Sequence, residues 1–145
     1  MSNNKIFKVT NSTFDGLKTV TILSLRKNFI EELSSLVFSG LSLVEELDLG
    51  QNRIRSVSAE TFSGLDHLRV LYLDDNDLQE VPTPSLHPLP HLAELDLALN
   101  NIKEHCQPLS VLQYSAVYST VYSTVQYCTV QFLIYSLDLI LALED

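Results

Sequence analysis

A 24-residue period is the feature of this 145-residue sequence that most restricts its fold. Four asparagines are each separated by 24 positions, namely Asn28, Asn52, Asn76 and Asn100. Leucine or valine recurs at three positions ahead of each asparagine, which gives four copies of the pattern (L/V)-x-x-L-x-L-x-x-N. A period of this length predicts a solenoid, in which each unit forms one coil and neighbouring coils share a continuous core.

The limits of the repeat divide the chain into three parts. Counting back 24 residues from Asn28 reaches Asn4, so the sequence starts within a repeat. Counting forward from Asn100 reaches Thr124, where the pattern has been lost. We therefore predict a partial first repeat at 1–13, four full coils at 14–105, and an apolar tail of low complexity at 106–145 that is not repeat-like.

Each unit has a strand-forming half and a wider half. The x-L-x-L stretch alternates as a short strand, with its leucines turned into the core and its x residues turned outward. A lone coil cannot bury its leucines, so stacked coils should place a parallel sheet on the inner curve. The predicted fold class is an α/β solenoid, a curved horseshoe with a short parallel sheet on its concave face and irregular or helical turns on its convex side.

The asparagine column is predicted to be structural. Each of Asn28, Asn52, Asn76 and Asn100 stands where the chain leaves the strand. An amide side chain there can satisfy backbone groups that a tight turn would leave unpaired. The column follows the period of the core, which favours this role over direct contact with a ligand.

The stretch VEELDLGQNRI at 44–54, followed by TFSGL at 61–65, resembles the 24-residue "typical" leucine-rich repeat of animal extracellular proteins. The resemblance extends from Asn4 to about Lys103. Similar arrays occur in Toll-like receptors, Slit proteins, small leucine-rich proteoglycans and neuronal leucine-rich-repeat transmembrane proteins. The resemblance implies a leucine-rich-repeat horseshoe, an extracellular or cell-surface location, and recognition of proteins through the concave sheet. The cysteine-rich caps of such arrays and a signal peptide are missing from this sequence, which indicates a truncated member.

The outward positions of the strands supply the candidate binding site. Neighbouring coils lie about 5 Å apart, so these positions form continuous columns. The predicted ligand-binding residues of the concave face are Glu46, Asp48, Val70, Tyr72, Asp74, Glu94 and Asp96. An aromatic side chain among polar neighbours suits an interaction hot spot. The alternative interpretation is that the acidic residues only solvate an exposed sheet and that Tyr72 fills a strand.

The charge balance restricts the class of partner. The sequence has 18 acidic and 9 basic residues and a formal net charge of −9. This acidity disfavours binding to the phosphates of nucleic acids. We expect a protein partner with a basic or neutral surface and no nucleic acid.

Neither catalysis nor a cofactor is predicted. The four histidines share no ligand spacing with the cysteines, and no nucleophile, base and orienting group recur in adjacent columns. Asp74, Asp75 and Asp77 offer clustered oxygen atoms, but the later glycine and glutamate of an EF-hand loop are absent, so no metal site is predicted. Cys106 and Cys128 could form one disulfide, and their pairing stays open.

Two further segments carry minor expectations. Asn11 begins an N-S-T acceptor for N-glycosylation. The tail contains YSAV, YSTV and YSTV in succession, a composition that either adds edge strands to the solenoid or stays disordered. Its most apolar stretch, 130–143, is shorter than the roughly 20 residues of a spanning helix, so membrane contact is not expected.

Two functions follow from the sequence. The first is a non-catalytic module that recognises a protein partner through the acidic concave face. The second is a truncated or aberrant product without stable independent activity.

Overall fold

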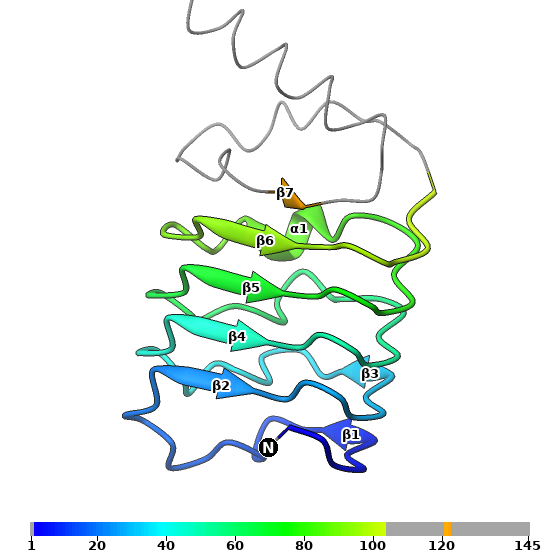
Figure 1. Ribbon diagram of the computed structural model, residues 1–145. Helices are drawn as coiled ribbons and strands as arrows, with labels where there is room; N and C mark the ends of the chain where they lie inside the picture. The colour runs from blue at the N-terminus through cyan, green and yellow to red at the C-terminus, as the bar shows by residue number, and fades with distance from the viewer. Residues whose placement is uncertain (1, 104–120, 123–145) are drawn as a thin grey trace, which may run out of the picture.

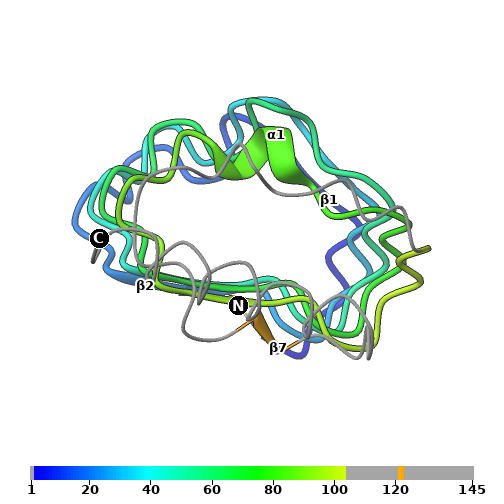
Figure 2. The same ribbon diagram turned by 90° about the horizontal axis from the view of Figure 1, so that it is seen from above.

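The computed structural model describes residues 2–103 and the backbone of residues 121–122. These residues form a stack of coils in which consecutive strands lie side by side (Figure 1). Viewed along the stack, each coil is a flattened ring with its strand on one long side and turns on the other (Figure 2). The fold is the predicted α/β solenoid with a parallel sheet, and the curvature of a horseshoe stays a prediction.

In the part of the chain that the structure describes, one five-stranded parallel sheet crosses all the coils. Its order is β2 (Ile22–Ser24), β4 (Glu46–Asp48), β5 (Val70–Tyr72), β6 (Glu94–Asp96) and β7 (Val121–Tyr122). Leu23 pairs with Leu47, Leu47 with Leu71, and Leu71 with Leu95, so the register advances by one repeat per coil. The middle residue of each of the first four strands is a buried leucine between two outward residues.

The core lies between the sheet and the opposite side of the coils. It is built from the repeated leucines and from a column of three phenylalanines on the side away from the sheet. Phe14 stacks on Phe38 with 5.6 Å between ring centroids, and Phe38 stacks on Phe62 at 6.1 Å. Burial of one such side chain stabilises the fold by roughly 1.5–3 kcal/mol. Since every coil contributes the same positions, the core continues from coil to coil.

Short elements connect the strands. On the side where the chain leaves the sheet, β1 (Lys8–Val9) pairs in parallel with β3 (Glu32–Leu33), and Glu32 forms a further bridge with Ser56. The fourth coil contains α1 (Thr83–Leu86), a single turn with Pro84 near its start. Proline is tolerated there because the first turn of a helix needs no N–H donors from its own residues. No helix among the described residues is long and apolar enough to cross a membrane.

Strand β7 departs from the 24-residue period. Leu95 pairs with Val121 and Asp96 with Tyr122, a step of 26 residues. The sequence allows two alternatives for the tail, added edge strands or disorder. Val121 and Tyr122 form an edge strand. Cys106, Cys128, most of the YSTV repeats and the apolar stretch at 130–143 lie outside the described residues.

Candidate interaction surface

The turn after each strand is made by a residue with positive φ. Lys27, Gln51, Asp75 and Leu99 stand directly before the four asparagines and have φ between 53° and 57°. A left-handed conformation is unfavourable for residues with a side chain, so surrounding interactions must hold it. The asparagine side chains supply those interactions.

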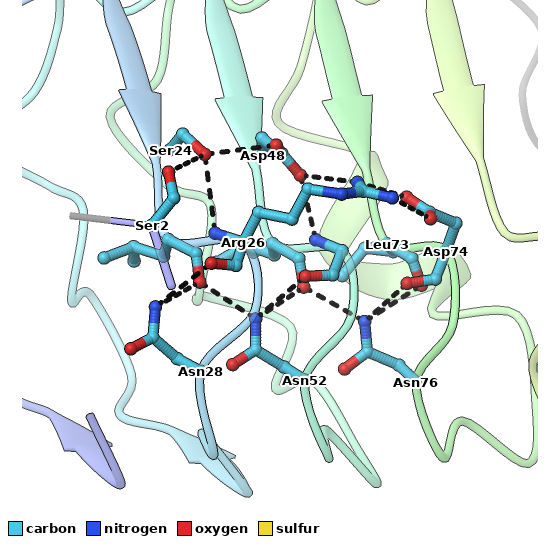
Figure 3. A network of polar contacts seen from close by, with 12 residues as sticks. Ser2, Ser24, Arg26, Asn28, Asp48, Asn52, Leu73, Asp74 and Asn76 are labelled. Carbon is cyan, nitrogen blue, oxygen red and sulfur yellow. Dashed lines mark hydrogen bonds and ion pairs between the residues drawn. The ribbon is translucent and has the colours of Figure 1, made fainter. Parts of the chain in front are cut away.

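The asparagines form a ladder of hydrogen bonds to the backbone (Figure 3). The side-chain nitrogen of Asn52 donates to the carbonyls of Leu25, Leu49 and Gly50 at 3.0–3.2 Å. Its side-chain oxygen accepts from the amide of Ile30 at 3.2 Å. Asn76 repeats this arrangement one coil further, and Asn28 and Asn100 bond in the same way to their own coil. These side chains are committed to the turn and are not presented to a ligand.

Arg26 forms an ion-pair network across three coils on the outer surface of the sheet. Its guanidinium donates two hydrogen bonds to the carboxylate of Asp74, at 2.9 and 2.5 Å, and one to Asp48 at 3.1 Å. Figure 3 shows the side chain extended over the neighbouring coil toward Asp74. The paired carboxylates keep the guanidinium charged and raise the pKa of Arg26 further above its ordinary value. We call Arg26, Asp48 and Asp74 the clamp.

Gly50 makes the clamp possible. It lies in the coil between Arg26 and Asp74, directly beneath the guanidinium. A Cβ atom at this position would collide with the Arg26 Nη1 and Asp74 Oδ1 atoms and would lie 2.9 Å from Arg26 Cζ. The absence of a side chain at residue 50 therefore gives the arginine its path to the third coil.

The clamp divides the predicted binding residues into two groups. Asp48 and Asp74 are largely buried, with side chains 15% and 12% exposed, and both are paired with Arg26. Asp48 also accepts from the Ser24 hydroxyl at 3.1 Å and from the Gly50 amide at 3.0 Å. These two carboxylates thus offer little charge to a partner.

The remaining five predicted residues form the open half of the sheet face, which we define as Glu46, Val70, Tyr72, Glu94 and Asp96. All five are half-buried, with no ion pair among the described residues. The register places Tyr72 beside Asp96, and places Val70 between Glu46 and Glu94. Burial, the charges of Glu94 and Glu46, and a hydrogen bond with Glu94 raise the pKa of the Tyr72 phenol. The phenol therefore stays neutral to higher pH than an ordinary tyrosine, with Glu94 as its hydrogen-bond partner.

A shallow hollow extends the open half toward the starts of the strands. It is lined by Thr21, Ile22, Glu45, Glu46, Arg69 and Val70 and has a volume of about 250 Å³. Ile22 is 62% exposed at its edge. The hollow combines aliphatic walls with the carboxylates of Glu45 and Glu46 and the guanidinium of Arg69, so it can receive an apolar stem but presents charges of both signs.

Other predicted features lie apart from this surface. Asn11 is exposed in the turn before Phe14, where the Thr10 amide donates to the Thr13 hydroxyl at 2.8 Å. Of the three aspartates considered for calcium, Asp74 belongs to the clamp. Within residues 2–103 no three side chains of His, Cys, Asp or Glu converge on one point that could hold a metal ion.

Sequence reasoning did not find the clamp, although its signal was present. Arg26, Gly50 and Asp74 occupy one outward column in three consecutive coils. A long cation, a glycine and a carboxylate in that order allow an ion pair over the middle coil. A count of the acidic residues does not reveal this ion pair, because it ignores the column and the coil in which each residue lies.

Comparison with known proteins identifies the family. The sequence profile described as "Leucine rich repeat" matches residues 1–54 and 42–102. The chain therefore belongs to the leucine-rich repeat family, as predicted. Domains of this family are generally protein-interaction modules. No curated protein sequence matches the chain.

A solved structure supports the fold. The chain is similar to the crystal structure of an internalin C2 from Listeria monocytogenes, with 28% sequence identity and a TM-score of 0.62. The match covers 83% of this chain and 48% of the internalin chain. The chain thus spans about half the length of this structural relative.

Proposed function

We propose that the chain is a non-catalytic protein-binding module that recognises a partner with a basic or neutral surface through the open half of the sheet face. The observation that carries the proposal is the clamp. Its single guanidinium pairs with Asp48 and Asp74 and offsets one of their two charges, whereas Glu46, Glu94 and Asp96 around Tyr72 have no ion pair among the described residues. Family membership supports protein recognition in general, and the open half supplies the chemistry.

Three features of the open half suit a partner with an exposed lysine or arginine. Carboxylates attract a cation and form charge-assisted hydrogen bonds with it. The Tyr72 ring can contact the cation or its apolar stem. The aliphatic walls of the hollow, Ile22 and Val70, can bury the neighbouring apolar surface of the partner.

The experiment begins with capture of partners by the full chain from cell-surface extracts and their identification by mass spectrometry. Each candidate is then purified and titrated by calorimetry. Binding to the Glu46→Lys/Glu94→Lys variant and to Tyr72→Ala should weaken about 30-fold or more, because each removes roughly 2 kcal/mol of interaction.

The matched control reverses two exposed acidic residues away from the sheet face, Asp15→Lys/Asp66→Lys. It changes net charge by the same amount and should bind within about twofold of the wild type. Equal loss in both double variants would reduce the effect to overall charge. Unchanged binding in the sheet-face variants would refute the assignment of this face.

The alternative, a product without stable activity, makes a different prediction. A functional module should elute as a monomer and unfold cooperatively by circular dichroism. Aggregation on size exclusion without a cooperative transition would favour the alternative.

We also propose an extracellular or cell-surface location. Exposure of Asn11 in its N-S-T acceptor supports this, because glycosylation of that residue requires the secretory pathway. After expression in mammalian cells as a secreted protein, glycosidase treatment should increase the electrophoretic mobility of the wild type and leave Asn11→Gln unchanged.

A further inference from the structure

A second surface lies on the side of the coils where the chain leaves the sheet, near β1 and β3 (Figure 1). Phe7 is 63% exposed there, and its ring stacks on Phe29 with 5.5 Å between centroids. The guanidinium of Arg53 lies over the Phe29 ring, 4.7 Å from its centroid. Phe7, Phe29 and Arg53 thus form a continuous row across three coils, which we call the aromatic–arginine strip.

The backbone holds this strip in place. The amide of Phe29 donates to the carbonyl of Ile6 at 2.9 Å, and the amide of Arg53 donates to the carbonyl of Ile30 at 2.9 Å. Ile30 is fully buried, so the alternate residues of this segment point outward. The solenoid therefore presents the three side chains from a rigid support.

The strip has the opposite charge from the open half of the sheet face. Lys5 and Arg53 are exposed, and Arg55 is 67% exposed. Glu31 offsets Arg55 through an ion pair at 3.4 Å. Within residues 2–103, Arg53 has no carboxylate partner. Asp77 follows Arg53 in the same column one coil further, so the surface carries Lys5, Arg53 and Arg55 against Glu31 and Asp77. It is cationic on balance and has an exposed phenylalanine, on a chain whose net charge is −9.

The stacking of Arg53 prepares it to bind a carboxylate. A guanidinium that lies over an aromatic ring uses its face for the ring and keeps its N–H donors at its edge. Those donors match the two oxygens of a carboxylate. The Phe7 ring stacks on Phe29 but is 63% exposed, so it is available to an apolar side chain.

We propose that the aromatic–arginine strip is a second interaction surface, and that its occupant is an acidic protein segment that carries an apolar side chain. The carboxylates of the segment pair with Arg53 and Lys5, and its apolar side chain packs on Phe7. The net negative charge of the chain repels a long polyanion, so a short acidic segment is favoured over nucleic acid. This surface is separate from the open half and does not depend on the function proposed for it.

The test uses the full chain and a rhodamine-labelled peptide of sequence GDELEDG, followed by fluorescence anisotropy. Phe7→Ser and Arg53→Gln should each weaken binding about tenfold. The controls Leu43→Ser and Lys18→Gln remove an exposed apolar and an exposed basic residue elsewhere, and should stay within about twofold of the wild type. Thermal unfolding by circular dichroism establishes that each variant is folded.

The comparison ligands make the outcome specific. Peptides GNQLQNG and GDESEDG, which lack the charges and the apolar side chain respectively, should bind at least about tenfold more weakly. Absence of binding to GDELEDG, or equal loss in the two control variants, would overturn the proposal. So would tighter binding of an octathymidylate, or loss of peptide binding in Glu46→Gln rather than Arg53→Gln. Dimers that Phe7→Ser abolishes in sedimentation equilibrium would identify a second copy of the chain as the occupant and equally overturn it.

Discussion

Two polar networks cross the coils side by side at the end of the sheet, and they differ in kind (Figure 3). The asparagine ladder recurs in every coil, and Asn28, Asn52 and Asn76 in it are buried and bonded to the backbone. Within the described residues the clamp occurs once, lies on the outer surface, and joins side chain to side chain over three coils. The polar residue that recurs in each coil maintains the turn. The polar residues that depart from the repeat determine which charges this part of the surface presents.

This comparison changes how the acidic sheet face is understood. The period alone predicts which residues face outward, but it does not predict which of them are available to a partner. The clamp pairs Asp48 and Asp74 with a cation within the molecule, whereas the carboxylates of the open half have no ion pair within the part of the chain that the structure describes. Available charge is therefore smaller and more localised than the count of acidic residues indicates.

The largest expected effect comes from breaking the ladder. Asn76→Ala removes side-chain hydrogen bonds to the carbonyls of Leu49, Leu73 and Asp74 and from the amide of Ile54. Several of these backbone groups would then be buried without a partner, so the free energy of unfolding should fall by about 3 kcal/mol. Urea denaturation measures it. The exposed Asn101→Ala is the control and should change stability by less than about 0.5 kcal/mol.

The next effect comes from closing the path of Arg26. In Gly50→Ala the new Cβ atom displaces the guanidinium, whose Nη1 atom bonds both Asp48 and Asp74, and we expect a loss of about 1.5 kcal/mol. Gly40→Ala offers a control of opposite sign, since a Cβ atom there meets nothing within 4 Å. It should be neutral or stabilise by about 0.5 kcal/mol, because alanine has fewer conformations in the unfolded chain. Equal behaviour of the two alanine variants would mean that the clamp contributes no stability.

A smaller effect isolates the ion pair itself. A double-mutant cycle of Arg26→Met and Asp74→Asn should give a coupling energy of about 1 kcal/mol at low ionic strength, since the groups are only partly exposed. The coupling should decrease in 1 M sodium chloride because salt screens the charges. The exposed pair Arg55 and Glu31 provides the comparison, and its coupling should be close to zero. A clamp coupling as small as that of the exposed pair would count against its role.

The sequence predicted the parts of the molecule that the repeat determines. Leucines at fixed spacing imply a parallel sheet in register, because one coil can bury them only against the next, and the structure has this register. The family assignment followed from the same columns. The function of the candidate residues stays a prediction.

The clamp, the hollow and the aromatic–arginine strip could not be predicted with the same ease. Each depends on contacts between outward residues of different columns or coils, where the period imposes no choice. Phe7 and Phe29 occupy different columns and meet diagonally, so the residues of a single column do not predict that the two rings stack. The 26-residue step to β7 was missed for a related reason, since a fixed period of 24 places Ser119 rather than Val121 beside Leu95.

The smallest effect tests the open half through Tyr72. Its phenol has a raised pKa because burial disfavours the charged form, and because Glu94 and Glu46 repel a phenolate. In the unfolded chain a tyrosine titrates near its ordinary value of about 10. The stability associated with the neutral phenol is therefore fully present below about pH 10 and is lost as the pH rises through the higher pKa of the folded state.

Wild type should lose more stability between pH 9 and pH 11 than Tyr72→Phe, as measured by urea denaturation at each pH. The other five of the six tyrosines are common to both proteins and cancel in this difference. Glu46→Gln should reduce the difference, since it removes one of the repelling carboxylates, and parallel pH profiles in all three proteins would show that Tyr72 does not experience the negative potential proposed for the open half.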